Sequence, residues 1–245
     1  MKVEINTNLP PDAHPASLGD DPPPNLSSAM ARAYEVWGRA HDAARELDAQ
    51  ADGLRPKLPA GAPKMTPVQR LQFDQREAAW RAQMNAHKAE LAEALRPKFE
   101  SAFVAFDSAV EKSRSESATL RGQLRSSLVK AKPDPVLQQR VFDMLGKKPT
   151  IAKLNEAIDT GDPDVISTIL GTSPFLLGVT QEQQTTMYDK AASKYQPELV
   201  KKIDENDKAV VRAERALVLF RDETASYMRK WRSPAQDVIE GARNV

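Results

Sequence analysis

Apolar residues recur at intervals of three and four through most of the chain. This spacing places them on one face of an α-helix, and no stretch of five or more residues alternates as a half-buried strand would. Prolines and glycines interrupt the pattern at a small number of places, which separate helices from turns. The sequence therefore predicts an all-α fold with long helices in a hairpin or bundle and a cluster of short helices.

The interruptions divide the chain into four segments. Residues 1–26 hold six of the 18 prolines and form an N-terminal arm. Residues 27–132 form a long-helix segment, residues 133–180 the short-helix cluster, and residues 181–245 a long C-terminal helix with a kink near 197 and a short terminal helix. Because proline fixes φ and lacks a backbone N–H, we expect the arm to be extended. Its few apolar side chains favour either a disordered tail or an arm that a neighbouring subunit orders.

Helix starts carry a recurrent signal, in which Ser, Thr or Asp precedes Pro. It occurs at Thr66, Asp134, Asp162, Ser173 and Ser233. Thr66 and Thr180 are each followed three residues later by Gln, which is the spacing of a capping box. Ser27 or Ser28 is the candidate cap of the first helix. We expect Pro97 to end or kink the helix that follows Thr66, and Pro197 to break the C-terminal helix.

Two stretches, residues 99–124 and 199–231, have side chains that step alternately by four and three. The centre of the first stretch is small and polar, at Ser113 and Ser117, and the second contains Asn206. A 3.5-residue repeat is typical of helices that pack along a seam. Packing of antiparallel helices within the chain is the simpler explanation, and assembly with other chains is the functional one. A helix can do both if it buries one stripe and presents another.

The turn after Pro174 contains three consecutive apolar residues, Phe175, Leu176 and Leu177. They belong either to the core or to an exposed anchor, and their apolar character favours the core. The candidate partner contacts in this turn and in the arm are Pro10, Pro11, Pro22, Pro23, Pro24, Phe175 and Leu176.

The composition of the chain mainly excludes certain classes of protein and of site. The chain has 35 Lys and Arg against 34 Asp and Glu, so it is neither polybasic nor polyacidic as a whole. It has no Cys, which excludes disulfides, thiolate metal sites and thiol catalysis. No run of 18 apolar residues indicates a membrane span, and the first residues lack the pattern of a secretory signal, so we expect synthesis inside the cell.

No chemistry-bearing motif is present. His14, His41 and His87 lack the spacing of a metal site, and the ten glycines form no phosphate-binding loop. Carboxylates lie among Lys and Arg at helical spacing, which indicates surface ion pairs rather than a catalytic pair. We assign no catalytic, cofactor-binding or metal-ligating residue and expect no cofactor.

One segment departs from the even balance of charge. Residues 112–153 contain ten Lys and Arg against three Asp and Glu, a net charge of +7 in 42 residues. Such a surface can contact phosphates without sequence preference, or it can be a solvated face or contact an acidic protein. The candidate phosphate or DNA contacts are Arg121, Arg125, Lys130, Lys132, Lys147 and Lys148.

Residues 161–179, GDPDVISTILGTSPFLLGV, contain a helix that ends in a small residue, then a Pro-aromatic-Leu turn, a Gly and the start of another helix. This segment resembles structural proteins from the head or neck region of tailed bacteriophages. The resemblance covers 19 residues and carries over no site residues. It implies a virion component without a catalytic role.

These observations predict a non-enzymatic structural or assembly protein of a bacteriophage virion, made in the host cytoplasm. Its arm and helical faces would bind other virion proteins (capsid, portal or neck), in a homo-oligomer or multi-copy assembly and without a membrane. One alternative is a helical protein that contacts DNA without sequence preference. Another is an assembly scaffold that is absent from the finished particle.

Overall fold

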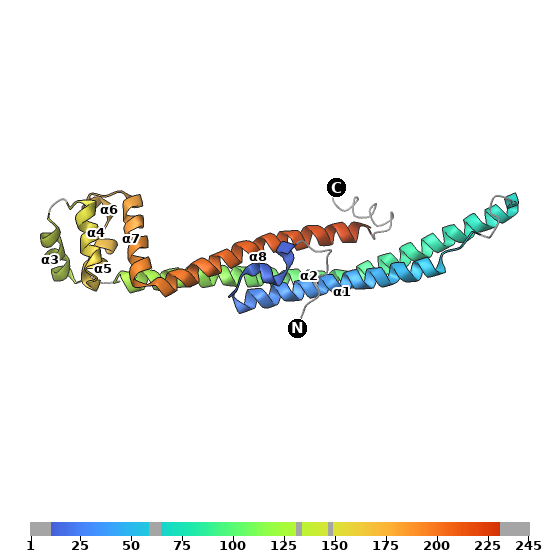
Figure 1. Ribbon diagram of the computed structural model, residues 1–245, viewed down its shortest axis with the longest axis horizontal. Coiled ribbons are helices and arrows are strands. Elements are labelled where there is room, and N and C mark those ends of the chain that lie inside the picture. The colour runs from blue at the N-terminus through green and yellow to red at the C-terminus, as the bar shows by residue number, and fades with distance from the viewer. Residues whose placement is uncertain (1–10, 59–64, 131–133, 147–148, 231–245) are drawn as a thin grey trace. The chain divides into compact units, whose positions relative to one another are not determined.

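The computed structural model contains helices and turns throughout the residues it describes (Figure 1). The described residues are 11–58, 65–130, 134–146 and 149–230. No residue in these ranges lies in a β-strand. The all-α prediction is confirmed.

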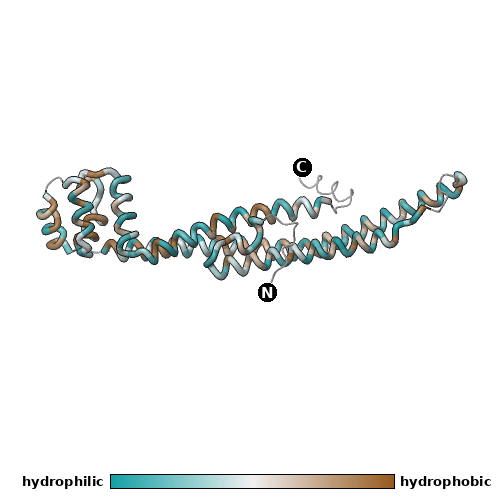
Figure 2. Tube along the Cα trace, viewed as in Figure 1, coloured by the Kyte–Doolittle hydropathy of each residue, from teal (hydrophilic) through white to brown (hydrophobic). Residues whose placement is uncertain are grey.

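The chain forms two compact units. Unit 1 comprises Met1–Glu111 and Val211–Val245, and unit 2 comprises Lys112–Val210. The long helices α2 (Pro67–Leu128) and α8 (Pro197–Lys230) contribute residues to both. Along α1, α2 and α8, hydrophobic positions recur among hydrophilic ones (Figure 2), as expected for helices with one apolar face. None of the helices in the described part of the chain combines the length and apolar composition that crossing a bilayer requires.

The described part of the N-terminal arm is not extended. It forms two short 3-10 helices, η1 (Pro11–Ala13) and η2 (Pro15–Leu18), which bury Ala13 and Leu18. Proline favours this geometry because its fixed φ lies in the 3-10 range. The expectation that the whole arm is extended is therefore wrong for these residues, and two small apolar side chains hold it in place.

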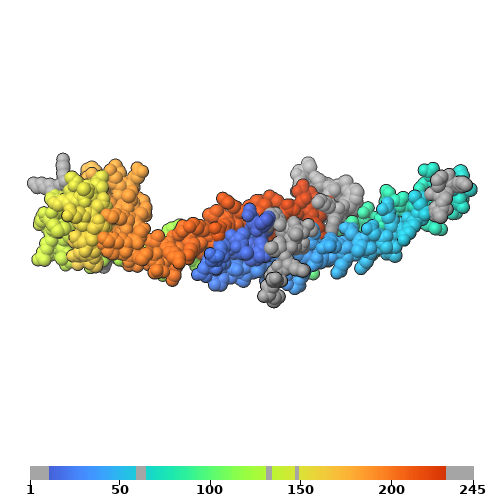
Figure 3. All heavy atoms as spheres, viewed as in Figure 1, coloured from blue at the N-terminus to red at the C-terminus, as the bar shows by residue number. Residues whose placement is uncertain are grey.

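The arm packs within unit 1. The ring of His14 makes an edge contact with Tyr34, at 5.0 Å between ring centroids. A Cβ atom on Gly19 would lie 2.9 Å from a guanidinium nitrogen of Arg212, so the chain after η2 runs close to α8. Figure 3 shows the N-terminal segment (blue) against α8 (red).

Helix α1 (Pro24–Leu54) begins three residues before the expected start. Its N-cap is Pro23, which has no side-chain cap hydrogen bond, and Pro24 is the first helical residue. Proline suits this position because the first N–H groups of a helix have no partner within it. The prediction that Ser27 or Ser28 caps this helix is wrong, since both lie inside it.

An aromatic cluster holds α1, α2 and α8 together in unit 1. Trp37 of α1 is buried, with its ring centroid 6.0 Å from that of Phe99 and 5.5 Å from that of Tyr227. The hydroxyl of Tyr227 donates a hydrogen bond to the carbonyl of Ala40 at 2.9 Å, and burial raises its pKa. Farther along, Phe106 packs edge-on against Phe220. The seams of α2 and α8 are thus buried against each other.

Helix α2 continues through Pro97, which the sequence suggested would end or kink it. A proline within a helix removes one hydrogen bond and crowds the carbonyl four residues earlier. Pro97 and Glu93 are both exposed, whereas Leu95 and Phe99 are buried on the other face. The interruption therefore faces solvent, and packing on both sides of it keeps the helix continuous.

Unit 2 joins short helices to the ends of the long ones. Its complete helices are α3 (Pro135–Leu145), α4 (Ile151–Asp159), α5 (Pro163–Gly171), α6 (Pro174–Leu177) and α7 (Gln181–Tyr195). Their core is mainly aliphatic, and includes the fully buried Leu154, Ile158 and Ile169. Helix α7 ends at Tyr195, and α8 begins at Pro197 as predicted.

The predicted caps account for most of these helix starts. The predicted caps Asp134 and Asp162 each accept a hydrogen bond from a backbone N–H in the first turn, and Thr150 does the same at the start of α4. Thr66 and Thr180 each form the predicted capping box. Ser173 makes no side-chain cap bond, although a helix does begin at Pro174. The terminal helix expected after Ser233 lies outside the described residues.

A polar layer interrupts the seam in unit 2. The side-chain amide of Asn206 donates to the carbonyl of Ser113 at 2.8 Å and to the hydroxyl of Ser117 at 2.6 Å. The Ser117 hydroxyl donates in turn to Asp207 at 2.7 Å. The small polar centre predicted for this seam is therefore buried within the chain.

Candidate protein-binding turn and the basic segment

Helix α6 presents two large apolar side chains to solvent. Phe175 is 88% exposed and Leu176 is 66% exposed, whereas Leu177 is 1% exposed. The expectation that this turn belongs to the core is therefore confirmed for Leu177 and wrong for the other two. A turn of four residues can place only one face against the core. Leu177 occupies that face, and its side chain is buried.

The turn is fixed at both ends. Leu177 N donates to the carbonyl of Ser173, and Val179 N donates to that of Pro174. Gly178 has φ 70°, a left-handed conformation that glycine adopts without strain and that ends the helix. The exposed pair is thus carried by an ordered turn.

A second set of hydrogen bonds ties the preceding segment to α7. The side-chain amide of Gln184 donates to the carbonyls of Leu170 and Thr172, at 3.3 and 2.7 Å. The hydroxyl of Thr172 donates to the carbonyl of Thr168 at 2.6 Å. These bonds fix the backbone segment between α5 and α6. The side chains of Phe175 and Leu176 therefore point in a defined direction.

The described candidate prolines lie at or just before the starts of helices in unit 1. Pro11 begins η1 and is exposed, and Pro24 is the exposed first residue of α1. Pro22 and Pro23 are half-buried before that helix. Pro10 lies outside the described residues. These prolines belong to a different unit from Phe175 and Leu176.

The basic segment is largely balanced by carboxylates of its own unit. Arg121 forms an ion pair with Asp207, and Lys130 forms one with Asp164. Lys132, Lys147 and Lys148 lie outside the described residues. Unit 2 as a whole has 15 Lys and Arg against 13 Asp and Glu, a net charge of +2. The excess of +7 in residues 112–153 is therefore mostly offset within unit 2.

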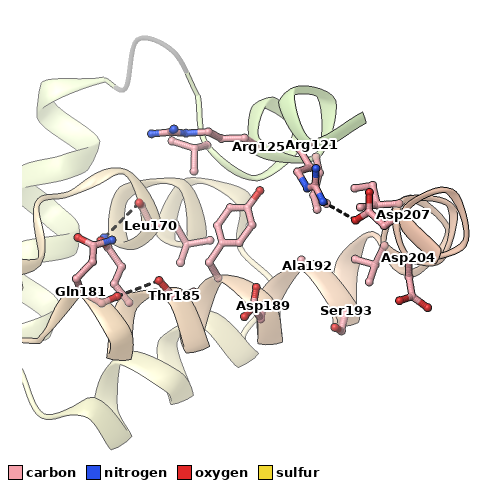
Figure 4. A pocket seen from close by; sticks show the side chains of 16 residues that line it. Arg121, Arg125, Leu170, Gln181, Thr185, Asp189, Ala192, Ser193, Asp204 and Asp207 are labelled. Atoms are coloured by element: carbon pink, nitrogen blue, oxygen red, sulfur yellow. Dashed lines mark hydrogen bonds and ion pairs between the residues drawn. The ribbon is translucent and has the colours of Figure 1, made fainter. Parts of the chain in front are cut away.

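Arg121 and Arg125 line a pocket of about 670 Å³ at the junction of α2, α5, α7 and α8. Apolar side chains such as Leu124 and Leu170 line it together with the carboxylates of Asp189, Asp204 and Asp207. Figure 4 shows Arg121 reaching toward Asp207. A phosphate placed against these arginines would also meet three carboxylates, which weakens its attraction. The pocket is therefore a mixed-charge surface rather than a basic one.

Tyr188 stands in this pocket beside Arg125. Burial raises the pKa of the Tyr188 hydroxyl, and the positive charge of Arg125 opposes that rise. The phenol is therefore neutral at physiological pH. No local pattern in the sequence indicates this pocket, because its lining comes from residues 121–207, whose side chains meet only after folding.

The three histidines make local contacts. His14 accepts a hydrogen bond from Ala16 N, the His41 ring packs on Trp37, and His87 lies 3.4 Å from Glu90. Within the described ranges, no group of three or more His, Asp or Glu side chains lies together as a metal site would require. The predicted surface ion pairs are confirmed at Glu93 with Arg96 and at Asp204 with Lys208.

Comparison of the chain with protein-family models, with curated proteins and with solved structures found no match. The function is therefore inferred from the chemistry of the chain's own surfaces.

Proposed function

We propose that this chain is a structural protein of a larger assembly, the head or neck of a tailed-bacteriophage virion. In this proposal the turn at Phe175 and Leu176 binds a neighbouring virion protein. The observation that carries it is an adjacent pair of large apolar side chains, 88% and 66% exposed, on a turn fixed by hydrogen bonds.

The energetics favour a binding role for this pair. Burial of a Phe or Leu side chain stabilises an interface by about 1.5–3 kcal/mol each. An ordered turn loses little conformational entropy on binding, so most of that free energy is available for affinity. Aromatic side chains that enter a partner's pocket commonly dominate an interface.

The local structure of residues 161–179 also supports the proposal. Helix α5 ends at the small residue Gly171, Pro174 opens the turn, and Gly178 separates it from α7. This is the order of features on which the resemblance to phage structural proteins rests. In this arrangement the aromatic residue of the motif faces solvent.

The test replaces Phe175 and Leu176 together with serine in the phage that encodes the chain. Particles are purified, and the amount of the chain is measured by mass spectrometry relative to the main capsid protein. We expect a loss of about tenfold or more, because two anchor side chains are removed. The melting temperature of the isolated variant should equal that of the wild type, since neither side chain is buried.

The matched control replaces Val136 and Met144 of α3, which are 61% and 54% exposed, with serine. This control should be retained in particles at the wild-type level. Retention of the Phe175→Ser, Leu176→Ser variant at that level would contradict the proposal. Absence of the wild-type chain from finished particles would contradict it too, and would favour an assembly scaffold.

A further inference from the structure

A second surface, in unit 1, has the properties of an interface between copies of this chain. A groove of about 340 Å³ runs between α2 and α8. It is lined by Phe103, Val104, Asp107, Leu217, Val218 and Arg221. Val104 is 71% exposed and Val218 is 48% exposed. The groove thus presents branched apolar side chains with one acidic and one basic residue beside them.

The apolar stripe on α8 is separate from its buried seam. Val211 and Val218 are seven residues apart and exposed, and both lie in unit 1. Ala213, Ala216 and Phe220 are buried on the seam of the same helix. Helix α8 therefore buries one stripe inside the chain and leaves a second one, at heptad spacing, on the surface.

The two helices run antiparallel along this groove. Phe106 packs on Phe220, and Trp37 contacts both Phe99 and Tyr227. In the direction in which residue numbers increase along α2, they therefore decrease along α8. A two-fold axis parallel to the helices would set α2 of one copy against α8 of the other, at the same level along the groove.

The exposed charges suit that arrangement. Asp107 is exposed on α2, and Arg221 is exposed on α8. Arg221 has a neighbouring carboxylate, Asp222, at 3.8 Å, and both side chains are highly exposed. Because Phe106 lies opposite Phe220, Asp107 and Arg221 lie at nearly the same level of the two helices, so they meet when α2 faces α8 of a second copy. Setting α2 against α2 would bring like charges together.

We propose that two copies of the chain associate through this groove about a two-fold axis parallel to α2 and α8. Val104, Val211 and Val218 are buried between the copies, and Asp107 of each copy pairs with Arg221 of the other. The contact is isologous, so a single surface suffices for a closed dimer. This inference does not depend on the proposed function.

The experiment measures the molar mass of the full chain by light scattering across a concentration series. The wild type should reach twice 27.1 kDa. Asp107→Arg and Arg221→Asp, each alone, should raise the dimer dissociation constant by about tenfold or more, because each places like charges opposite one another. An equimolar mixture of the two variants should form a heterodimer, since opposite charges then meet at both contacts.

The matched controls are Asp42→Arg and Arg32→Asp, which make the same charge changes at exposed positions of α1. These should dimerise as the wild type does. All variants should keep the wild-type helicity, since each substituted side chain is exposed. A wild-type chain that stays monomeric across the concentration series overturns the proposal. A mixture that fails to restore the dimer overturns it as well.

Discussion

The two units reach stability by different means. Unit 1 has long helices with an aromatic core around Trp37. Unit 2 has short helices of four to fifteen residues with an aliphatic core around Leu154 and Ile158. A short helix gains little from its own hydrogen bonds, so it depends on caps and packing. A long helix spreads its stabilisation along a seam and needs fewer end signals.

The contrast extends to the shared helix pair. In unit 1, Phe106 packs on Phe220, whereas in unit 2 Asn206 bonds to Ser113 and Ser117. The spacing of the seam is the same in both. Apolar layers supply most of the burial free energy, and a buried amide that needs particular partners selects one register of the helices. Similar periodicity therefore supports two kinds of layer with distinct physical roles.

The largest effect should follow from Trp37→Ala. Trp37 is buried among α1, α2 and α8, so we expect a loss of about 3–5 kcal/mol in the free energy of unfolding. Ile158→Ala in unit 2 is the counterpart, with an expected loss of about 2–5 kcal/mol. Hydrogen exchange measured by mass spectrometry should show that each variant loses protection chiefly in its own unit. Equal loss in both units for both variants would contradict the division.

An intermediate effect is expected from Asn206→Ala. It removes the donor to Ser117 and opens space in the seam, at a cost of about 1–3 kcal/mol. A double-mutant cycle with Ser117→Ala, followed by urea denaturation, should give non-additive losses, because the two side chains share a hydrogen bond. Strict additivity would show that the polar layer is not a coupled unit.

The smallest effect is a pH-dependent one at Asp159. Hydrogen bonds from Lys190 at 2.7 Å and Lys194 at 3.0 Å lower the pKa of its carboxyl from the usual 3.8. A lowered pKa in the folded state stabilises the protein above pH 3.8, and that contribution is lost as the pH falls through the lower value. Asp159→Asn should therefore melt at a lower temperature than the wild type near neutral pH, and the difference should disappear in acid.

The control for this prediction is Asp143→Asn. Asp143 is exposed and accepts a hydrogen bond from Gln139. Thermal melts of the two variants across the same pH range should show the pH-dependent difference at Asp159 and little at Asp143. A difference at Asp159 that persists unchanged in acid would contradict the assigned role of the lysines.

Local signals in the sequence predicted much of the fold. Caps such as Asp162 and Thr180, and the break at Pro197, act within a few residues, so their residue types reveal them. Pro97 is the exception, since its effect depends on which face of α2 is buried. That face is set by packing against other helices, which no local pattern records. The burial of Ala13 and Leu18 of the arm depends likewise on packing against other helices, so the sequence did not indicate it.

The candidate site was less predictable. The exposure of Phe175 depends on Leu177 occupying the core, and three adjacent apolar residues do not show which one points inward. Arg121 and Asp207 are 86 residues apart in sequence, so their ion pair has no local signal. A run of basic residues could therefore be identified, whereas the carboxylates that offset it could be found only in the folded chain.

Pro97 also has a mechanical consequence. At that point α2 lacks one backbone hydrogen bond on its exposed side, while the buried side remains packed. A rod with one such position is more compliant there than along the rest of its length. Under a bending load, α2 of unit 1 would yield first beside Glu93, and its core contacts would stay intact.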